Sequence, residues 1–442
     1  MNYYSQIKWV DEYISNLKPY IYVREDDNLL IKIPNTAYKL NNSGFKIINA
    51  LINGESVIDI LEKFSDKEKK AEDIHHFFCD IRSIFKGCYN EKDERSSVEK
   101  IPFTFDFNQL PVLSEIAVTY RCNLSCKFCY AGCGCKKQNN SKELKTGEFK
   151  KIISMIKNEA KVPSVSFTGG EPLLRDDIFD LISYAKELGM WTNLITNGTL
   201  INEEKAINLK KAGLDSAQVS IEGPGPEIHD HIVNSNGAFS DSIKGIKELM
   251  KKGIRVHTNT TISKLNVNHT EGIILLVKSL GLDKFSMNML MPEGSAIGNI
   301  DELLVTYTEV GNKIPEIQRT AEKYNILFMW YSPTPICIFN PITSGLGNKG
   351  CAACDGLLSI TPDGFILPCS SYPKKMANMM KIKDDFKKVW TSPAFKFFKE
   401  KRFAHELCKN CRYFEICNGA CPLYWDKLGY EELLINSGGG NN

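Results

Sequence analysis

The sequence predicts an α/β protein whose central part is a parallel sheet closed into a barrel or part of one. We expect this part to be flanked by an N-terminal α+β domain and a C-terminal cysteine-rich extension. Short β-rich runs alternate with helical patterns through the middle of the chain, and most of the 15 cysteines lie in two blocks on either side of it. With 442 residues, 43% of them hydrophobic, the chain is long enough for two or three domains.

Composition excludes several kinds of partner. The 55 Lys and Arg residues nearly balance the 53 Asp and Glu residues, so overall charge draws the protein to neither nucleic acid nor an anionic membrane. No apolar run approaches the roughly 18 residues of a membrane span, and the N-terminus has no basic segment followed by an apolar one. We therefore expect a cytoplasmic protein, in which many cysteines indicate metal or redox chemistry rather than disulfides.

The N-terminal domain is expected over residues 1–95. Residues 29–66 show a strand, a turn of small residues and two helical patterns, the second opened by Glu55 and Ser56. The charged segment that follows ends at a proline, so residues 96–111 are expected to be a mobile linker.

The barrel is expected over residues 112–300. Its strands are predicted at LSEIAVTY, SVSFTG, NLITNG, SAQVSIEG, RVHTNTTI and KFSMNML, each followed along the chain by a polar segment or helical pattern. Repeated strand–helix units predict parallel strands with helices outside, and six such units make a partial (β/α)6 TIM-like barrel. Functional residues of such sheets lie at the C-terminal ends of the strands.

Three regions follow the barrel. Residues 301–336, with a long helical pattern and a strand, are expected to bridge it to the cysteine-rich extension at 337–430. Residues 431–442 are expected to be a flexible tail.

The first cysteine block directly follows the first predicted strand. In CNLSCKFC, Cys122, Cys126 and Cys129 are separated by three and two residues. Three thiolates on a short loop can hold three irons of a [4Fe-4S] cluster and leave the fourth iron open, whereas a structural zinc takes four protein ligands. This spacing resembles the cluster motif of the radical S-adenosylmethionine (radical SAM) superfamily. The resemblance implies a catalytic [4Fe-4S] cluster whose open iron binds S-adenosylmethionine.

Polar segments at later strand ends extend the resemblance. TGGEP, residues 168–172, has paired glycines that allow close backbone approach, and in the family it holds the methionine amino group of the cofactor. The segment at 219–230 is similar to the one that reaches the cofactor ribose, and aromatic residues beside the cysteines are candidates to flank the adenine. The implied cofactor-binding residues are Phe128, Tyr130, Gly169, Gly170, Glu171, Asn197, Ser220 and Glu222.

The second cysteine block resembles the SPASM extension, which carries auxiliary iron-sulfur clusters in many radical enzymes that modify peptides. CDGLLSITPDGFILPC ends at Cys369, and CKNCRYFEICNGAC spaces its cysteines by two, five and three residues. Structural zinc knuckles are the alternative. The resemblance implies two auxiliary clusters, of the [4Fe-4S] type in the family pattern, held first by Cys351, Cys354, Cys369 and Cys421 and second by Cys408, Cys411, Cys417 and a further cysteine downstream.

That downstream cysteine is absent, because none follows Cys421. Cys337 folding over, a carboxylate such as Asp426, or an auxiliary iron left open for substrate are the alternatives, with the first two preferred. Cys133 and Cys135 are either spare thiols or groups that approach substrate.

Residues 29–66 resemble the winged-helix peptide recognition domain of ribosomal peptide maturation, as in the chaperone of pyrroloquinoline quinone synthesis. The resemblance implies that the sheet edge binds a leader peptide by strand addition. A helical cap on the barrel is the alternative. A winged helix also suggests DNA binding, but the dense basic run KEKK lies among acidic residues, so no nucleic acid is expected.

Together these resemblances imply a radical SAM peptide maturase. Such an enzyme generates a 5′-deoxyadenosyl radical that takes hydrogen from a precursor peptide, forming a thioether, which we prefer, or a carbon-carbon crosslink. The implied partners are a precursor peptide with its leader and a reductant such as flavodoxin or ferredoxin.

Rival functions remain open at this point. The same barrel and extension serve enzymes that act on protein sulfatases or on tetrapyrroles, in which case the N-terminal domain would be incidental. A non-catalytic iron-sulfur or zinc protein would require TGGEP to be a coincidence.

Overall fold

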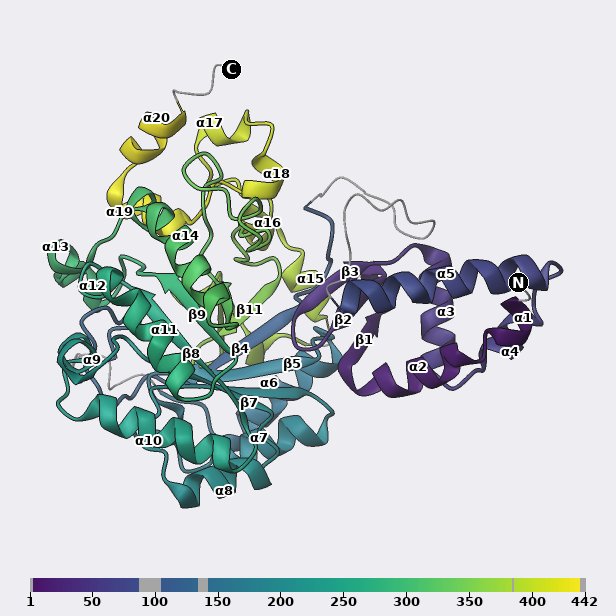
Figure 1. Ribbon diagram of the computed structural model, residues 1–442, viewed down its shortest axis with the longest axis horizontal. Coiled ribbons are helices and arrows are strands. Elements are labelled where there is room, and N and C mark those ends of the chain that lie inside the picture. Colours follow the sequence, from purple (N-terminus) through teal and green to yellow (C-terminus); the bar gives the residue numbers. More distant parts are fainter. Residues whose placement is uncertain (1–2, 87–104, 134–141, 384, 438–442) are drawn as a thin grey trace. The chain divides into compact units, whose positions relative to one another are not determined.

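The computed structural model describes residues 3–86, 105–133, 142–383 and 385–437 (Figure 1). The chain divides into two units, Met1–Val112 and Leu113–Asn442, and each is described by itself. Within the described ranges, no helix combines the length and the apolar character that a membrane crossing requires.

The N-terminal unit is a small antiparallel sheet packed on helices. Its strands, in spatial order, are β1 (Ile21–Arg24), β2 (Leu29–Lys32) and β3 (Thr36–Lys39). Its helices are α1 (Tyr3–Gln6), α2 (Trp9–Leu17), α3 (Asn42–Ile52), α4 (Val57–Leu61) and α5 (Lys67–Phe85). The side chains of Asn41, Ser56 and Asp66 cap α3, α4 and α5 by accepting backbone N–H groups, which explains where these helices begin.

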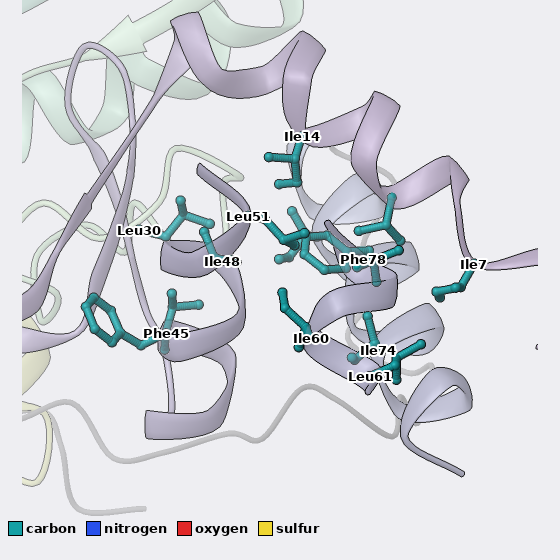
Figure 2. Packing of buried hydrophobic residues seen from close by; sticks show 14 of the residues in the cluster. Ile7, Ile14, Leu30, Phe45, Ile48, Leu51, Ile60, Leu61, Ile74 and Phe78 are labelled. Carbon is teal, nitrogen blue, oxygen red and sulfur yellow. The ribbon is translucent and has the colours of Figure 1, made fainter. Parts of the chain in front are cut away.

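One face of this sheet and the helices share a hydrophobic core. Figure 2 shows Leu30 of β2 beside Ile48 and Leu51 of α3, with Phe78 of α5 nearby. These side chains are almost completely buried. The core therefore holds strands and helices together through apolar burial.

The opposite face of the sheet is covered by the end of the predicted linker. Leu29 and Ile31 of β2 pack against Val112, and Phe107 lies against the same cluster. Both faces of the sheet are thus covered within the N-terminal unit.

A buried ion pair fixes this linker segment. Arg24 donates to Asp27 at 2.8 Å and to the carbonyl of Leu110 at 3.0 Å, and Asp27 accepts the N–H of Gln109 at 2.8 Å. Both charged side chains are 0% exposed. The prediction of a mobile linker over 96–111 is therefore wrong for residues 105–111, because hydrogen bonds and apolar contacts order them. Residues 96–104 lie outside the described residues.

The second unit contains a ten-stranded sheet that runs mainly parallel. Its spatial order is β10-β9-β8-β7-β6-β5-β4-β11-β12-β13, with parallel pairing from β10 to β11 and antiparallel pairing beyond. The strands are β4 (Leu113–Thr119), β5 (Ser164–Gly169), β6 (Trp191–Thr196), β7 (Ser216–Ser220), β8 (Arg255–Ile262), β9 (Lys284–Met289), β10 (Leu327–Trp330), β11 (Leu357–Ile360), β12 (Phe365–Leu367) and β13 (Ala377–Asn378).

Helices follow the parallel strands and lie around them in Figure 1. They are α6 (Thr146–Asn158), α7 (Ile178–Glu187), α8 (Glu203–Lys211), α9 (Pro226–Val233), α10 (Ala238–Lys251), α11 (Thr270–Ser279), α12 (Ser295–Gly298), α13 (Ile300–Leu303) and α14 (Tyr307–Lys323). Because successive strand residues point to opposite faces, one face of each strand meets these helices. Phe167, Leu194 and Phe285 on that face are 0% exposed.

The C-terminal extension continues from the sheet into short helices. These are α15 (Phe386–Trp390), α16 (Pro393–Lys399), α17 (Glu406–Lys409), α18 (Phe414–Cys417), α19 (Pro422–Leu428) and α20 (Glu431–Ser437). The prediction of a flexible tail is wrong for residues 431–437. The Glu432 carboxylate accepts hydrogen bonds from Thr308 of α14 and Tyr424 of α19, which anchors α20. The remaining tail residues lie outside the described part of the chain.

Two glycines let the end of β5 approach the chain that leaves β4. A Cβ atom on Gly169 would lie 2.0 Å from the Thr119 carbonyl oxygen, and one on Gly170 would lie 2.2 Å from that of Arg121. Gly169 also has a φ of +133°, which only glycine adopts readily. The backbones meet directly here, and Gly170 N–H donates to Thr119 at 2.8 Å.

We expect Asp27→Ala to destabilise the N-terminal unit by about 3–5 kcal/mol, because the charge of Arg24 would stay buried without its partner. Asp73→Ala is the matched control. It breaks the exposed pair with Lys70, also three residues apart, and should change stability by less than about 1 kcal/mol. Urea unfolding followed by hydrogen exchange of residues 107–112 measures the difference, and equal effects would contradict the buried-pair interpretation.

We expect Gly170→Ala to destabilise the second unit by about 1–3 kcal/mol or more, because the added methyl group overlaps the Arg121 carbonyl. Gly147→Ala is the control, since nothing lies within 4 Å of the Cβ added there in α6. Thermal unfolding compares the two. A Gly170 variant as stable as the Gly147 variant would show that this approach tolerates a side chain.

Candidate active site

The first cysteine block forms a loop at the C-terminal end of β4. Cys122, Cys126 and Cys129 are each partly exposed. The loop is tightly turned, since Cys129 N–H donates to the Cys126 carbonyl at 3.2 Å and Leu124 N–H approaches the Cys122 sulfur at 3.5 Å. Burial raises the pKa of Cys122 to about 11 and that of Cys126 well above its usual value. These thiols therefore become thiolates readily only beside a compensating positive charge such as iron.

Cys133 lies directly beside this loop. It is buried, its N–H points to the Cys129 sulfur at 3.4 Å, and hydrogen bonding from its side chain lowers the pKa of Cys129 to about 6. The structure thus places the Cys133 thiol against the cysteine loop. Its role, as a spare thiol or as a group that approaches substrate, stays a prediction. Cys135 lies outside the described residues.

Glu171 joins the ends of β5 and β6. Thr196 donates to both carboxylate oxygens at 2.9 Å, and the Asn197 N–H donates to one of them at 2.9 Å. The Asn197 side chain in turn donates to Asn123 in the cysteine loop at 2.9 Å and lies 4.0 Å from the Cys122 sulfur. Glu171 is 0% exposed, so it acts here as a brace that positions Asn197. The paired glycines place this brace against Arg121, next to Cys122.

The ends of β7 and β8 hold the remaining predicted cofactor residues. Glu222 is 1% exposed, accepts the Thr261 N–H at 2.8 Å and gives its own N–H to His229 at 3.1 Å. Burial raises the pKa of Glu222 to about 8, so this carboxyl is largely protonated at neutral pH. Ser220 pairs in register with Asn259.

Sequence reasoning missed His229 and Asn266 as parts of this group of strand-end residues. Asn266 donates to the Glu222 carbonyl at 3.0 Å and to the Thr261 carbonyl at 2.9 Å, which joins two strand ends. Asn259, by contrast, stands in a polar run at the end of a predicted strand. His229 and Asn266 are brought in by tertiary folding alone.

The two aromatic candidates have different surroundings. Phe128 packs against the cluster of Leu290, Ala296 and Leu303, so packing accounts for much of its position. Tyr130 follows Cys129, and burial raises the pKa of its hydroxyl. Gly294 lies so close that an added Cβ would be 2.3 Å from the Tyr130 carbonyl oxygen. The turn after β9 therefore packs on the backbone of the cysteine loop.

Four cysteines of the C-terminal extension lie close enough to interact electrostatically. Cys354, Cys369 and Cys421 are each affected by Cys351 as well as by burial, and burial raises the pKa of Cys354 and Cys421 to about 12. The Cys421 sulfur also lies 3.4 Å from the sulfur of Met291 in the turn after β9. The predicted first auxiliary set thus comes together beside the barrel.

The thiol chemistry fits iron-sulfur clusters better than zinc. A structural zinc takes four protein ligands that converge on a single ion. A cluster of four irons instead separates its cysteine ligands around its own volume. A buried set of thiols with raised pKa values suits such a charged, multi-iron group.

Comparison with known families agrees with this chemistry. Residues 116–277 match the radical SAM superfamily, and residues 351–412 match the SPASM iron-sulfur cluster-binding domain. The chain is 30% identical over 317 residues to an AdoMet-dependent heme synthase of Oleidesulfovibrio alaskensis, covering 68% of this chain and 80% of the relative. It is 28% identical over 323 residues to the enzyme of that name from Methanosarcina barkeri, covering 70% and 90%.

Solved structures share the fold. Streptococcus suis SuiB bound to the precursor peptide SuiA aligns with a TM-score of 0.66 at 16% identity, over 92% of this chain and 95% of that one. Native anSMEcpe with bound AdoMet aligns with a TM-score of 0.60 at 19% identity, over 74% and 96%.

The predicted α/β fold with a partial TIM-like barrel and a cysteine-rich extension is confirmed. So are an enzymatic activity and the cofactors of the two domains, a [4Fe-4S] cluster with S-adenosylmethionine and SPASM iron-sulfur binding. The chain therefore belongs to the radical SAM superfamily, among the enzymes that carry a SPASM iron-sulfur domain.

Proposed function

We propose that this enzyme modifies a ribosomally synthesised precursor peptide and that its N-terminal unit binds the leader of that peptide. The observation that carries the proposal is β3, which lies at the edge of a sheet whose two faces are already covered. Because both faces are covered within the described unit, a partner can pair with this sheet only at one of its edges. Strand addition at an edge is a common mode of peptide binding.

The register shows which backbone groups of β3 face the open edge. Leu40 N–H donates to the Asn28 carbonyl at 2.8 Å, so these residues form a hydrogen-bonded pair. In an antiparallel ladder such pairs alternate, and the register Ile31↔Ala37 and Leu29↔Lys39 falls between them. The N–H and C=O groups of Ala37 and Lys39 therefore point away from β2, where an added peptide strand would pair with them.

The extent of the structural match supports a role for this unit. Leu113–Asn442 makes up about three quarters of the chain, so the alignment with SuiB, which covers 92%, includes much of the N-terminal unit. The match to the heme synthase of O. alaskensis covers 68%. The longer structural match thus favours a peptide substrate, since SuiB was solved bound to a precursor peptide.

The inner face of the barrel also favours a peptide. Register pairs place Ser166 beside Asn193 and Asn259 beside Ser286, with side-chain hydrogen bonds of 3.2 Å and 2.8 Å. TIM barrels usually fill this interior with branched apolar residues. At these four positions the barrel carries amide and hydroxyl groups instead. Amide side chains offer the donor and acceptor pair that complements a peptide group.

Cations are scarce on that inner face. Among the strand residues of β4–β10 that face inward, Arg255 and Lys284 are the arginine and lysine residues, and both begin their strands, at the end opposite the cysteine loop; His257 on the same face contacts Gln218 at 3.2 Å. A dicarboxylate such as heme is best held by arginine or lysine. The inner wall is therefore better suited to an uncharged segment.

When bound, the cluster and S-adenosylmethionine supply a radical that takes one hydrogen atom from the peptide. Closing one thioether or carbon-carbon bond would remove a second hydrogen from the peptide as a proton and an electron. An auxiliary iron-sulfur centre would be suited to accept the electron. The residues of this chain position the cysteine loop through Gly170, Glu171 and Asn197 and present amide and hydroxyl groups on the inner face of the barrel strands.

A second candidate function is modification of a tetrapyrrole. The names of the sequence relatives favour it, since identity to the heme synthases reaches 30%. An enzyme that acts on a folded protein, of the sulfatase-maturase type, is a further variant of the peptide proposal.

We also propose a reducing, cytoplasmic location and reduction by a flavodoxin or ferredoxin. All described cysteines are free thiols, which is typical of reducing compartments.

The first test incubates the anaerobically reconstituted enzyme, a reductant and S-adenosylmethionine with synthetic peptides encoded by short reading frames beside its gene. We expect 5′-deoxyadenosine together with a peptide lighter by two hydrogens, measured by mass spectrometry. A carboxylate-bearing tetrapyrrole is offered in parallel. Conversion of the tetrapyrrole with no change in any peptide would overturn the proposal in favour of the second candidate.

The second test places proline on the sheet edges. Ala37→Pro removes an outward N–H of β3 and should weaken binding of the modified peptide about tenfold or more, without breaking pairing to β2. Val23→Pro is the matched control on the opposite edge. Its N–H also points outward, because Ile33 N–H donates to the Tyr20 carbonyl at 2.9 Å and Val23 falls between bonded pairs. Calorimetric titration with the peptide compares the variants, and equal weakening by both would show that β3 is not the docking edge.

A further inference from the structure

We propose that Cys337 completes the second auxiliary cysteine set, so that Cys337, Cys408, Cys411 and Cys417 together hold one iron-sulfur cluster. This inference concerns the SPASM extension and does not depend on the identity of the substrate. It assigns a ligand that lies upstream of the residues matching the SPASM domain, which begin at 351.

The second set needs a fourth ligand because the chain supplies no later cysteine. Cys408, Cys411 and Cys417 lie on one compact turn, in which Cys411 N–H donates to the Cys408 carbonyl at 3.0 Å and Cys417 N–H donates to that of Tyr413 at 2.8 Å. Cys421 is the last cysteine of the sequence and belongs with Cys351 in the first set. Clusters of four irons in proteins are usually held by four ligands.

The segment around Cys337 lies directly against this turn. Ile336 N–H donates to the Cys417 sulfur at 3.3 Å, and the Cys417 sulfur lies 4.0 Å from the Thr334 carbonyl oxygen. Residues separated by about 80 positions in the chain are therefore in contact, one residue from Cys337 on its N-terminal side. The backbone places the Cys337 side chain at the edge of the second set.

The same segment is anchored on both sides of Cys337. Thr334 N–H donates to the Lys349 carbonyl at 3.0 Å, and its hydroxyl accepts the Trp330 indole N–H at 2.8 Å. On the other side, Phe339 packs on Gly311 of α14, where an added Cβ would lie 2.9 Å from the Phe339 Cβ. A glycine inside a helix costs stability, and this close contact accounts for it. The loop is thus held in place independently of any metal.

Electrostatic neighbours identify the same grouping. Partial burial, then Cys417 and Cys411, raise the pKa of Cys337 to about 11. Burial, then Cys417, Cys337 and Cys411, raise the pKa of Cys408 to about 12. These shifts agree with the contact between Ile336 and the Cys417 sulfur, which places Cys337 beside this set.

Although Asp426 and Cys408 act together on Tyr430, Asp426, the rival ligand, also acts on the first set. Its charge acts on Cys421 of the first set and on Tyr372, three residues after Cys369. It does not act on Cys408 or Cys337 in the contacts that raise their pKa values. The first set already has four thiols, so Asp426 is not needed as a ligand there.

The test uses Cys337→Ala in the full chain, reconstituted anaerobically, with iron and sulfide analysis, EPR and Mössbauer spectroscopy as readouts. Wild type should hold about twelve irons and the variant about eight to eleven, because the second cluster loses its fourth ligand. We expect a three-iron EPR signal in the oxidised variant that wild type lacks. Cys337→Ser keeps an oxygen ligand and should retain more iron with an altered spectrum.

Two control variants decide between the ligands. Cys79→Ala removes a thiol outside both sets, and Asp426→Asn removes the rival carboxylate, so both should keep the wild-type iron content and spectra. Loss of iron in Asp426→Asn, or wild-type iron and spectra in Cys337→Ala, would overturn the proposal; the second result would indicate an auxiliary iron left open.

A measurement on the unmodified protein guards against misfolding of the alanine variant. Cys337 is exposed, so a free thiol there should react with iodoacetamide, whereas a ligand is protected until a chelator removes the iron. Peptide mapping of the holoenzyme reports this directly. Rapid alkylation of Cys337 in the fully loaded enzyme would also overturn the assignment.

Discussion

The backbone contact between Gly169–Gly170 and Thr119–Arg121 is the constraint on which the active site depends. It brings the end of β5 within hydrogen-bond distance of the chain that leads into Cys122, with no side chain between them. Glu171 is the next residue, and its carboxylate accepts the N–H of Asn197, which positions Asn197 at the end of β6. A cysteine loop with little regular structure of its own is thus positioned by neighbouring strands in the interior of a parallel sheet.

The two lines of comparison divide along the chain. Sequence identity to the heme synthases reaches 30%, and that match is no longer than the barrel and extension. Structural likeness to SuiB extends into the N-terminal unit. The barrel and the extension supply the chemistry that these enzymes share. Substrate choice therefore depends on the domain attached to them and on the residues of the inner face of the barrel. Both of these features, an edge strand and a neutral polar lining, suit a peptide.

Much of this architecture is readable from sequence because local and global signals agree there. Strands such as NLITNG are short β-rich runs between helical patterns, and β6 buries every second residue, as expected of a strand with one covered face. The predicted linker and tail failed for a different reason. Their order comes from partners distant in sequence, Arg24 and Asp27 for residues 109–110 and Thr308 for Glu432, and composition carries no trace of such partners. Cys337 differs from these: counting the thiols named it as an alternative to Asp426, but spacing, which identifies ligands that share a turn, could not choose between two residues from other segments.

The buried pair of Arg24 and Asp27 has a consequence for how a bound peptide reaches the barrel. Because it secures residues 109–111 to the first sheet, the N-terminal unit continues to Val112, and the barrel begins at Leu113. The two units are consecutive in the chain, and the described residues include no flexible spacer between Val112 and Leu113. The effective concentration of a tethered substrate falls as its tether lengthens. Under the proposed function, the number of residues between the leader and the modified segment would therefore set which residue of the peptide reacts.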